Sequence, residues 1–113
     1  MDDVVAERVL RAVELVPPGR VVSYGDLGEL VGRGPRLVGR VMSTYGSDVA
    51  WWRVVNASGE HVPHLRAAAF ERWADEGIAV KPNGRGCRIA DYRADLEALA
   101  SAHAAACADL PPI

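Results

Sequence analysis

The sequence predicts a mainly α-helical domain with a small β-hairpin, arranged as a winged-helix-like helix-turn-helix. Three observations lead to this fold class. Apolar residues recur at helical spacing in several segments, two short helical segments flank a glycine-containing turn, and a late extended segment turns through Pro-Asn-Gly. Because 113 residues suit one modest core, we expect residues 1–113 to form a single domain.

The composition excludes several classes of protein. Hydrophobic residues make up 50% and charged residues 25% of the chain, which is an ordinary globular balance. No apolar run approaches the roughly 20 residues of a membrane span, and no secretion signal follows the acidic N-terminus. Cys87 and Cys107 are too few for a disulfide framework. We therefore expect a cytoplasmic monomer with no membrane contact, no cofactor and no metal.

The first helix is expected to start at a cap formed by Asp2 or Asp3 and to end near Leu15. Pro17-Pro18-Gly19 then stops it. Its apolar stripe comprises Val5, Val9, Val13 and Val16, flanked by Ala6, Leu10 and Ala12.

A helix-turn-helix is predicted next. After a short extended piece at 20–22, Ser23 caps a second helix, with Asp26 three residues later as an imperfect capping box. The tight turn at 32–35 leads into a third helix, from Arg36 to about Thr44. The inward residues of these two helices are Leu27, Leu30, Val31, Leu37, Val38 and Val41.

The remaining segments complete the predicted domain. Residues 53–56 read as a short strand, and 65–76 as a helix that ends at Gly77 and buries Leu65, Ala69 and Trp73. Residues 78–89 read as a small hairpin or wing. A final alanine-rich helix, capped by Asp91, runs to about Ala108.

The charge distribution indicates a basic patch. The formal net charge of −2 does not by itself suggest a nucleic-acid-binding protein. From Arg33 to Arg53, however, the sequence contains four arginines and one acidic residue, Asp48, so the local net charge is +3. This patch fits either phosphate binding or a solvated helix face.

Three motifs in order carry a family resemblance. The strings V-P-P-G-R-V-V-S-Y-G-D-L, P-R-L-V-G-R-V-M and V-A-W-W-R-V-V resemble the DNA-binding domain of O6-alkylguanine-DNA alkyltransferases. The resemblance covers about residues 10–80, with 91–108 as an added C-terminal helix. It implies the winged-helix-like fold of the alkyltransferase C-terminal domain.

The departures from the family pattern bear on function. Where the family has Pro-Cys-His-Arg-Val, this chain has Ala-Trp-Trp-Arg-Val, so Trp51 and Trp52 replace the nucleophile and the histidine that activates it. Alkyl transfer needs a thiolate, and an indole N–H can only donate. Glu76 matches the glutamate that would orient the histidine. The chain is therefore similar to the alkyltransferase-like proteins. They flip and bind O6-alkylguanine in double-stranded DNA without repairing it, and flag it for nucleotide excision repair proteins.

The resemblance implies a lesion pocket formed by Tyr24, Val49, Trp51 and His64. Trp51 would offer a flat apolar wall to the extruded base, although core packing is the alternative. His64 falls where related members place a cationic residue over the lesion. His61 lies three residues before it, but no third ligand lies nearby in the sequence to complete a metal site.

The resemblance also implies DNA contacts outside the pocket. Arg36 would enter the base stack in place of the flipped nucleotide, and Tyr24 would crowd the phosphate and promote rotation. A phosphate contact and a half-buried turn tyrosine are the alternatives. The predicted DNA-binding residues are Ser23, Tyr24, Arg36, Gly39, Arg40 and Arg53.

Two other functions remain open. A helix-turn-helix regulator of undamaged DNA would need polar side chains that reach base edges from the third helix, where Leu37, Val38 and Val41 offer none. A true alkyltransferase would need another nucleophile. Cys87 lacks the family's Pro-Cys-His-Arg context, so an ordinary semi-buried thiol is the favoured interpretation.

Overall fold

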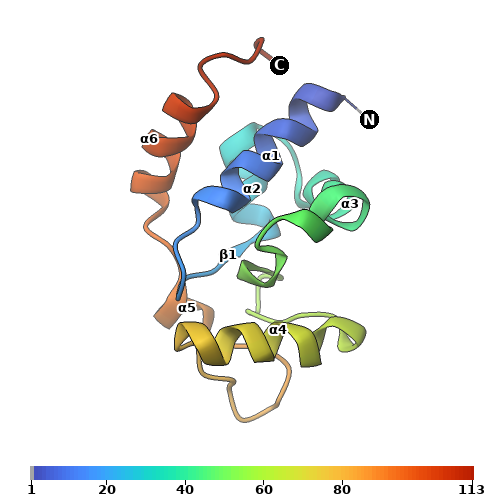
Figure 1. Cartoon of the computed structure of the whole chain (residues 1–113), viewed down its shortest axis with the longest axis vertical. Helices are drawn as coiled ribbons and strands as arrows, with labels where there is room; N and C mark the ends of the chain where they lie inside the picture. The colour runs from blue at the N-terminus through green and yellow to red at the C-terminus, as the bar shows by residue number, and fades with distance from the viewer. Residues whose placement is uncertain (1) are drawn as a thin grey trace.

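The computed structural model describes residues 2–113, so Met1, the first residue of the predicted domain, lies outside it. The protein is elongated, 43 × 26 × 21 Å, with both termini at one end and α4 at the other (Figure 1). The elements are α1 (Asp3–Leu15), β1 (Val22–Ser23), α2 (Tyr24–Val31), α3 (Pro35–Tyr45), η1 (Gly46–Asp48), η2 (Trp51–Arg53), β2 (Val54–Val55), α4 (Pro63–Glu76), α5 (Ile89–Tyr92) and α6 (Leu96–Ala106).

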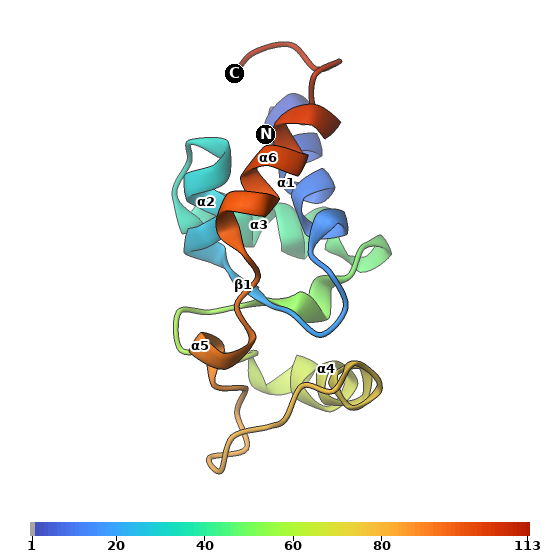
Figure 2. The same cartoon turned by 90° about the vertical axis from the view of Figure 1, so that its left-hand side faces the viewer.

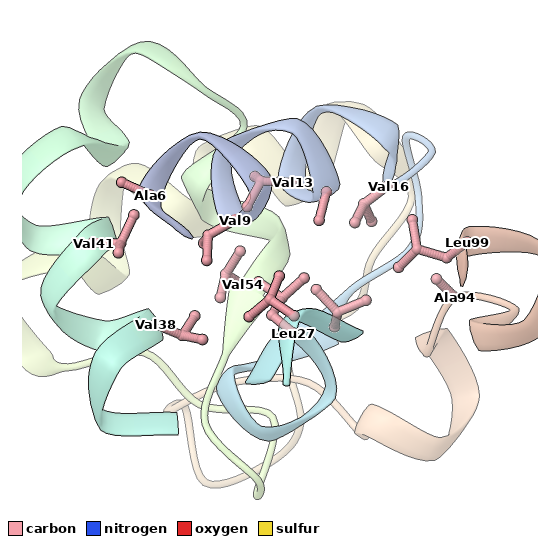
Figure 3. Close-up of a cluster of buried hydrophobic side chains, with 13 residues drawn as sticks. Ala6, Val9, Val13, Val16, Leu27, Val38, Val41, Val54, Ala94 and Leu99 are labelled. Atoms are coloured by element: carbon pink, nitrogen blue, oxygen red, sulfur yellow. The ribbon is translucent and has the colours of Figure 1, made fainter. Parts of the chain in front are cut away.

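The main core lies between α1, α2 and α3, as the apolar spacing predicts. Asp2 caps α1 by accepting a hydrogen bond from the Val4 amide at 2.9 Å. The buried stripe of α1 packs on the inner faces of α2 and α3 (Figure 3). The main core includes Ala6, Val9, Ala12, Val13 and Val16 from α1, with Leu27, Val31, Val38 and Val41 from α2 and α3.

The helix-turn-helix forms where it was predicted. Ser23 and Asp26 make a complete capping box: the Ser23 side chain accepts from the Asp26 amide at 3.0 Å, and Asp26 accepts from the Ser23 amide at 2.9 Å. Gly32 ends α2 in the left-handed region at φ 71°, which favours glycine. Gly28 permits the close turn, because a Cβ there would lie 2.5 Å from the Arg33 carbonyl oxygen.

The strand pairing differs from the predicted hairpin. The two-stranded sheet is parallel and pairs Val22 with Val54 and Ser23 with Val55. In the sequence, the helix-turn-helix therefore lies between the two strands. Residues 78–89 form no strand. The segment makes a turn that is closed by a hydrogen bond from the Lys81 amide to the Gly86 carbonyl oxygen. Its backbone then bonds the loop at residues 59–61, because Gly59 and Gly86 allow the two backbones to touch.

The end of the chain also differs from the prediction. Asp91 does not cap the final helix; it lies within the short α5, and Asp95 caps α6 by accepting from the Ala98 amide at 3.0 Å. Between these helices the backbone runs beside β1, where the Val21 amide donates to Tyr92 and the Ala94 amide donates to Val21. Figure 2 shows this segment passing close to β1.

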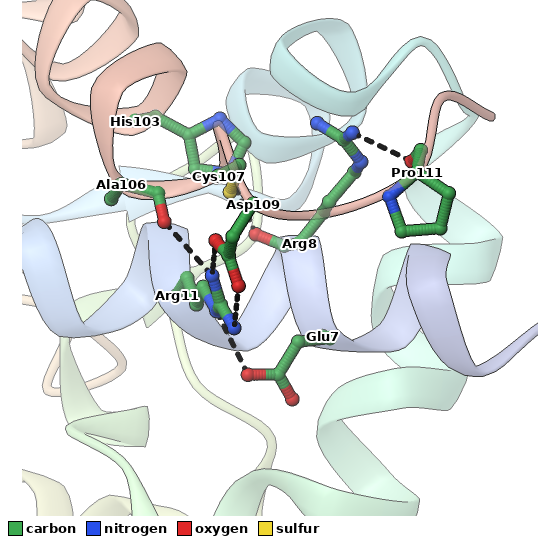
Figure 4. Close-up of polar contacts among 8 residues, drawn as sticks. All are labelled: Glu7, Arg8, Arg11, His103, Ala106, Cys107, Asp109 and Pro111. Atoms are coloured by element: carbon green, nitrogen blue, oxygen red, sulfur yellow. Dashed lines mark hydrogen bonds and ion pairs between the residues drawn. The ribbon is translucent and has the colours of Figure 1, made fainter.

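Polar contacts fasten α6 and the C-terminal tail to α1 (Figure 4). Arg11 donates to the Ala106 carbonyl at 2.8 Å and pairs with Asp109 at 2.7 Å, while Arg8 donates to the Pro111 carbonyl at 2.9 Å. The buried His103 contacts the Arg8 carbonyl at 2.8 Å. Within residues 2–113, no helix combines the length and apolar character that a membrane crossing requires.

Candidate nucleic-acid interface

A cavity of about 590 Å³ opens between α3 and the start of α4. Its walls are mostly apolar, and Tyr24 at the start of α2 also contributes to them. The lining residues are Tyr24, Gly39, Met42, Ser43, Gly46, Ser47, Trp51, His61, Val62, His64 and Leu65. The structure therefore brings three of the predicted pocket residues, Tyr24, Trp51 and His64, to one cavity.

Val49, the fourth predicted pocket residue, does not line this cavity. It packs against the main core and lines a separate cavity of about 370 Å³ between α1 and η1. The tight 3-10 turns at 46–48 and 51–53 lie on either side of Val49, and helical periodicity in the sequence gave no sign of them. The structure thus places Val49 outside the cavity that Tyr24, Trp51 and His64 share.

Trp51 and Trp52 lie in the 3-10 turn η2 rather than in an extended strand. Their rings meet edge to face, with centroids 6.0 Å apart and planes at 85°, so they serve different environments. Trp51 lines the cavity, whereas Trp52 packs against the second core cluster with Phe70, Trp73 and Ile78.

Glu76 at the end of α4 holds this turn in place. Its carboxylate accepts hydrogen bonds from the Trp52 indole at 2.7 Å, from the Gly19 amide at 2.9 Å and from the Arg53 guanidinium at 2.9 and 3.0 Å. Burial opposes ionisation, but these hydrogen bonds outweigh it and hold the pKa of Glu76 below its usual value. The Trp52 indole therefore donates to the carboxylate that, by the family resemblance, would accept a hydrogen bond from a histidine.

Arg53 is held inside the protein. Its side chain is 13% exposed, its guanidinium pairs with Glu76, and it also donates to the Val16 carbonyl at 3.0 Å. Every guanidinium nitrogen thus has a protein partner. This arrangement favours a structural role over the DNA contact predicted from the sequence.

Ser23 also has a structural function. It is buried, and its side-chain oxygen caps α2. The predicted contact of this side chain with DNA therefore competes with the cap that starts the helix.

The outer face of α3 carries the free positive charge of the site. Arg36 and Arg40 are exposed, and among the described residues neither makes an ion pair. Gly39 lies one turn after Arg36 on the same face and lines the cavity. Because a Cβ on Gly39 would meet nothing within 4 Å, glycine leaves open space here for a ligand to approach the helix backbone.

Tyr24 and His64 lie at different parts of the cavity. Tyr24 is half-buried at the first residue of α2, and burial raises the pKa of its phenol. His64 is exposed in the first turn of α4. Both are therefore available to a ligand in the cavity.

His61 is a pocket residue that the sequence analysis missed. It is 4% exposed, lines the cavity and stands edge to face with Trp51 at a centroid distance of 5.8 Å. Sequence alone placed it beside His64 in a loop, and its depth depends on packing against Trp73 from α4.

Neither cysteine is placed as a substitute nucleophile. Cys87 is buried in the second core cluster, and burial raises the pKa of its thiol. Cys107 is buried next to His103, with its Sγ 3.3 Å from the Nε2 of that histidine (Figure 4). Over residues 2–113, no group of three or more His, Cys, Asp or Glu side chains is placed to hold a metal ion.

The fold and the site together define the class of protein. A helix-turn-helix presents an arginine-bearing helix, and a cavity of about 590 Å³ opens beside that helix. This is the architecture of a DNA-binding domain with a pocket at its recognition helix. Residues 4–76 match the family model of the 6-O-methylguanine DNA methyltransferase, DNA binding domain, and the chain belongs to this family.

Two bacterial relatives give a further comparison. The DNA base-flipping proteins of Escherichia coli (strain K12) and Shigella flexneri are each 40% identical to this chain over 62 residues. Each match covers 51% of this chain and 48% of the relative, so the chain spans about half the length of these relatives.

Solved structures confirm the fold class. The chain is similar to S. pombe Atl1 in complex with damaged DNA containing O6-carboxymethylguanine, with a TM-score of 0.72 and 24% identity. It is also similar to S. pombe ATL in complex with DNA, with a TM-score of 0.71 and 25% identity. Both matches cover 84% of this chain and 98% of the other.

Proposed function

We propose that this protein recognises O6-alkylguanine in double-stranded DNA by flipping the damaged nucleotide into the cavity, without repairing it. The observation that carries the proposal is the position of the Trp51-walled cavity directly beside the exposed arginine face of α3. A base that leaves the duplex needs both a pocket to receive it and a side chain to fill the stack.

The cavity and α3 divide these tasks between them. Trp51, Met42 and Leu65 provide apolar surface for an alkylated purine. Arg36 lies one turn from the cavity along the same helix and fills the vacated position in the stack. Tyr24, on the α2 side of the cavity, crowds the phosphate of the rotating nucleotide. Arg40 binds the phosphate backbone.

The side chain at position 51 supports the proposed lack of alkyl transfer. Trp51 stands where the family has its cysteine, and an indole offers no lone pair for attack on an alkyl carbon. We infer from the resemblance that the bound lesion is handed to nucleotide excision repair proteins.

Binding to matched duplexes tests the proposal. We expect tighter binding to a duplex containing O6-methylguanine than to the same duplex with guanine, because the lesion weakens its base pair and lowers the cost of extrusion. Fluorescence anisotropy at physiological salt measures both affinities. Equal affinities would instead support a regulator that binds undamaged DNA.

Restoring the family's cysteine should restore little alkyl transfer. We expect Trp51→Cys to transfer almost no methyl group, since an ordinary thiol with a pKa near 8.5 is only a few per cent ionised at about pH 7. Glu76 is already bonded to Trp52, and burial lowers the pKa of the neighbouring His61, which makes it a weak base. The measurement is transfer of a labelled methyl group from duplex DNA in a single turnover.

The double variant Trp51→Cys/Trp52→His is the matched comparison. An imidazole at position 52 would meet the Glu76 carboxylate, so transfer should exceed that of either single variant. Losing a packed tryptophan costs about 3–5 kcal/mol, so folding is verified by circular dichroism first. Rapid stoichiometric transfer by Trp51→Cys alone would contradict this prediction, and transfer by the unmodified protein would overturn the proposal.

A further inference from the structure

The protonation of His61 is fixed by its hydrogen bond. Its Nε2 lies 3.0 Å from the Trp52 carbonyl oxygen, which also accepts a hydrogen bond from the Trp73 indole at 2.8 Å. A carbonyl oxygen can only accept, so Nε2 of His61 carries a hydrogen and donates it. In the neutral ring the other nitrogen, Nδ1, then bears a lone pair.

His61 is held in the neutral form. Burial lowers the pKa of the imidazole, and the positive charge of Arg66 acts in the same direction, against the effect of the Trp52 hydrogen bond. Arg66 also donates to the His61 carbonyl at 2.8 Å and so fixes the backbone. At neutral pH, Nδ1 is therefore a hydrogen-bond acceptor and not a donor.

Nδ1 of His61 remains accessible to a ligand. Within residues 2–113, Arg8 Nε is the one fully buried side-chain nitrogen or oxygen without a partner. Nδ1 also has no protein partner, so it keeps contact with solvent although His61 is 4% exposed. The residue lines the cavity, which makes the cavity the side from which a donor can approach.

The other polar side chains of the cavity are less selective. The hydroxyl groups of Tyr24, Ser43 and Ser47 rotate and can either donate or accept, and the exposed imidazole of His64 can present either ring nitrogen to a ligand. The His61 ring cannot rotate freely, because it is held by the Trp52 carbonyl and packed between Trp51 and Trp73 at centroid distances of 5.8 and 5.4 Å. A fixed acceptor in an apolar cavity selects for a donor on the ligand, since a ligand without one leaves it unpaired.

We propose that Nδ1 of His61 accepts a hydrogen bond from the exocyclic amino group at C2 of the flipped purine, so that the pocket selects 2-aminopurine lesions. This inference depends on the proposed function and adds the ligand class that the pocket selects. Alkylation at O6 removes the hydrogen from N1 of guanine. The C2 amino group is then the remaining donor on the base-pairing edge.

Four duplexes of identical sequence test this assignment. They carry O6-methylguanine, its analogue 6-methoxypurine without the C2 amino group, guanine or hypoxanthine. The wild-type protein should show a larger gain in affinity from the amino group than the matched variant His61→Phe. The expected difference is about three- to tenfold, the range for one neutral hydrogen bond. Comparing the two proteins on the same duplexes cancels differences in base-pair strength between the DNAs.

His61→Phe keeps an aromatic ring against Trp51 and Trp73 while removing the acceptor, and thermal unfolding verifies its fold. A second measurement uses the wild-type protein labelled with ¹⁵N-histidine. The His61 Nδ1 resonance should move on binding O6-methylguanine DNA and remain in place with 6-methoxypurine DNA. This readout holds even when the variant does not fold.

The outcomes separate the two proposals. If both lesions bind better than guanine but His61→Phe leaves the amino-group dependence unchanged, or the Nδ1 resonance responds equally to both lesions, the role of His61 is overturned and the proposed function stands. If neither lesion binds better than its unmodified counterpart, the proposed function itself fails.

Discussion

Replacing Glu76 with alanine should lower the free energy of unfolding by about 3 kcal/mol, which is the scale for leaving a largely buried charge without its partner. The variant would leave the Arg53 side chain, which is 13% exposed, without its ion-pair partner. It would also remove the hydrogen-bond acceptor of the Trp52 indole and the Gly19 amide. Trp52 and Arg53 lie in the 3-10 turn η2 and Gly19 lies in the loop after α1, so one carboxylate at the end of α4 joins three segments of the chain. Urea unfolding followed by circular dichroism measures the change.

Glu7→Ala is the matched control for Glu76→Ala. Glu7 also pairs with an arginine, Arg11, at 2.9 Å, but its side chain is 47% exposed and Arg11 keeps Asp109 as a second partner. We expect a loss of about 0.5 kcal/mol or less for this surface pair. Equal losses in the two variants would show that burial does not set the contribution of Glu76.

The contribution of Glu76 should also depend on pH. Because the folded-state pKa of Glu76 is lowered, its stabilising effect is fully present above its ordinary pKa of about 4.5. The effect is then lost as the pH falls through the lower folded-state value. The difference in unfolding free energy between the wild type and Glu76→Ala should therefore shrink in acid.

The second large effect is expected for Arg36→Ala, on recognition rather than on folding. This variant should lose about 10- to 100-fold of its affinity for O6-methylguanine DNA, the range for a hydrogen bond from a charged group. It should lose much less for undamaged DNA. Arg36 is exposed and makes no ion pair among the described residues, so its removal leaves the fold unchanged. Anisotropy titrations on both duplexes give the ratio of affinities.

Arg40→Ala is the control on the same face of α3. We expect it to weaken binding to both duplexes equally and to reduce the salt dependence by about one phosphate contact. If Arg40→Ala removed the lesion preference while Arg36→Ala preserved it, the proposed roles of the two arginines would be reversed.

Local signals in the sequence were sufficient for most of the fold. The stripe in α1, the cap at Ser23, the glycine turn at 32–35 and the end of α4 at Gly77 are each set by residues close in the chain. The parallel pairing of β1 with β2 was not predicted, because it joins residues 32 positions apart and no turn sequence marks it. The hairpin strands predicted at residues 78–89 did not form for a related reason, since the backbone partners of this segment lie in the loop at residues 59–61.

The candidate site was predictable in part. Motif order placed Tyr24, Trp51 and His64, which do share a cavity. Residue type alone could not show that Arg53 donates its hydrogen bonds to Glu76 and the Val16 carbonyl, or that His61 is buried against Trp73. Both outcomes depend on the direction in which η2 and α4 present their side chains, which is a tertiary property.

The return of the C-terminal segment beside β1 bears on how this chain is made by a ribosome. The family match ends at residue 76, yet Ala94 and Leu99 complete the main core, and Ile78 and Cys87 complete the second cluster. The Val21 amide donates to the Tyr92 carbonyl, and the Val21 carbonyl accepts from the Ala94 amide. A nascent chain cut off at the end of the recognisable motif region would thus display two unfinished apolar surfaces. Synthesis must pass residue 99 before both apolar clusters are complete, so the unit of folding extends beyond the segment that the family model matches.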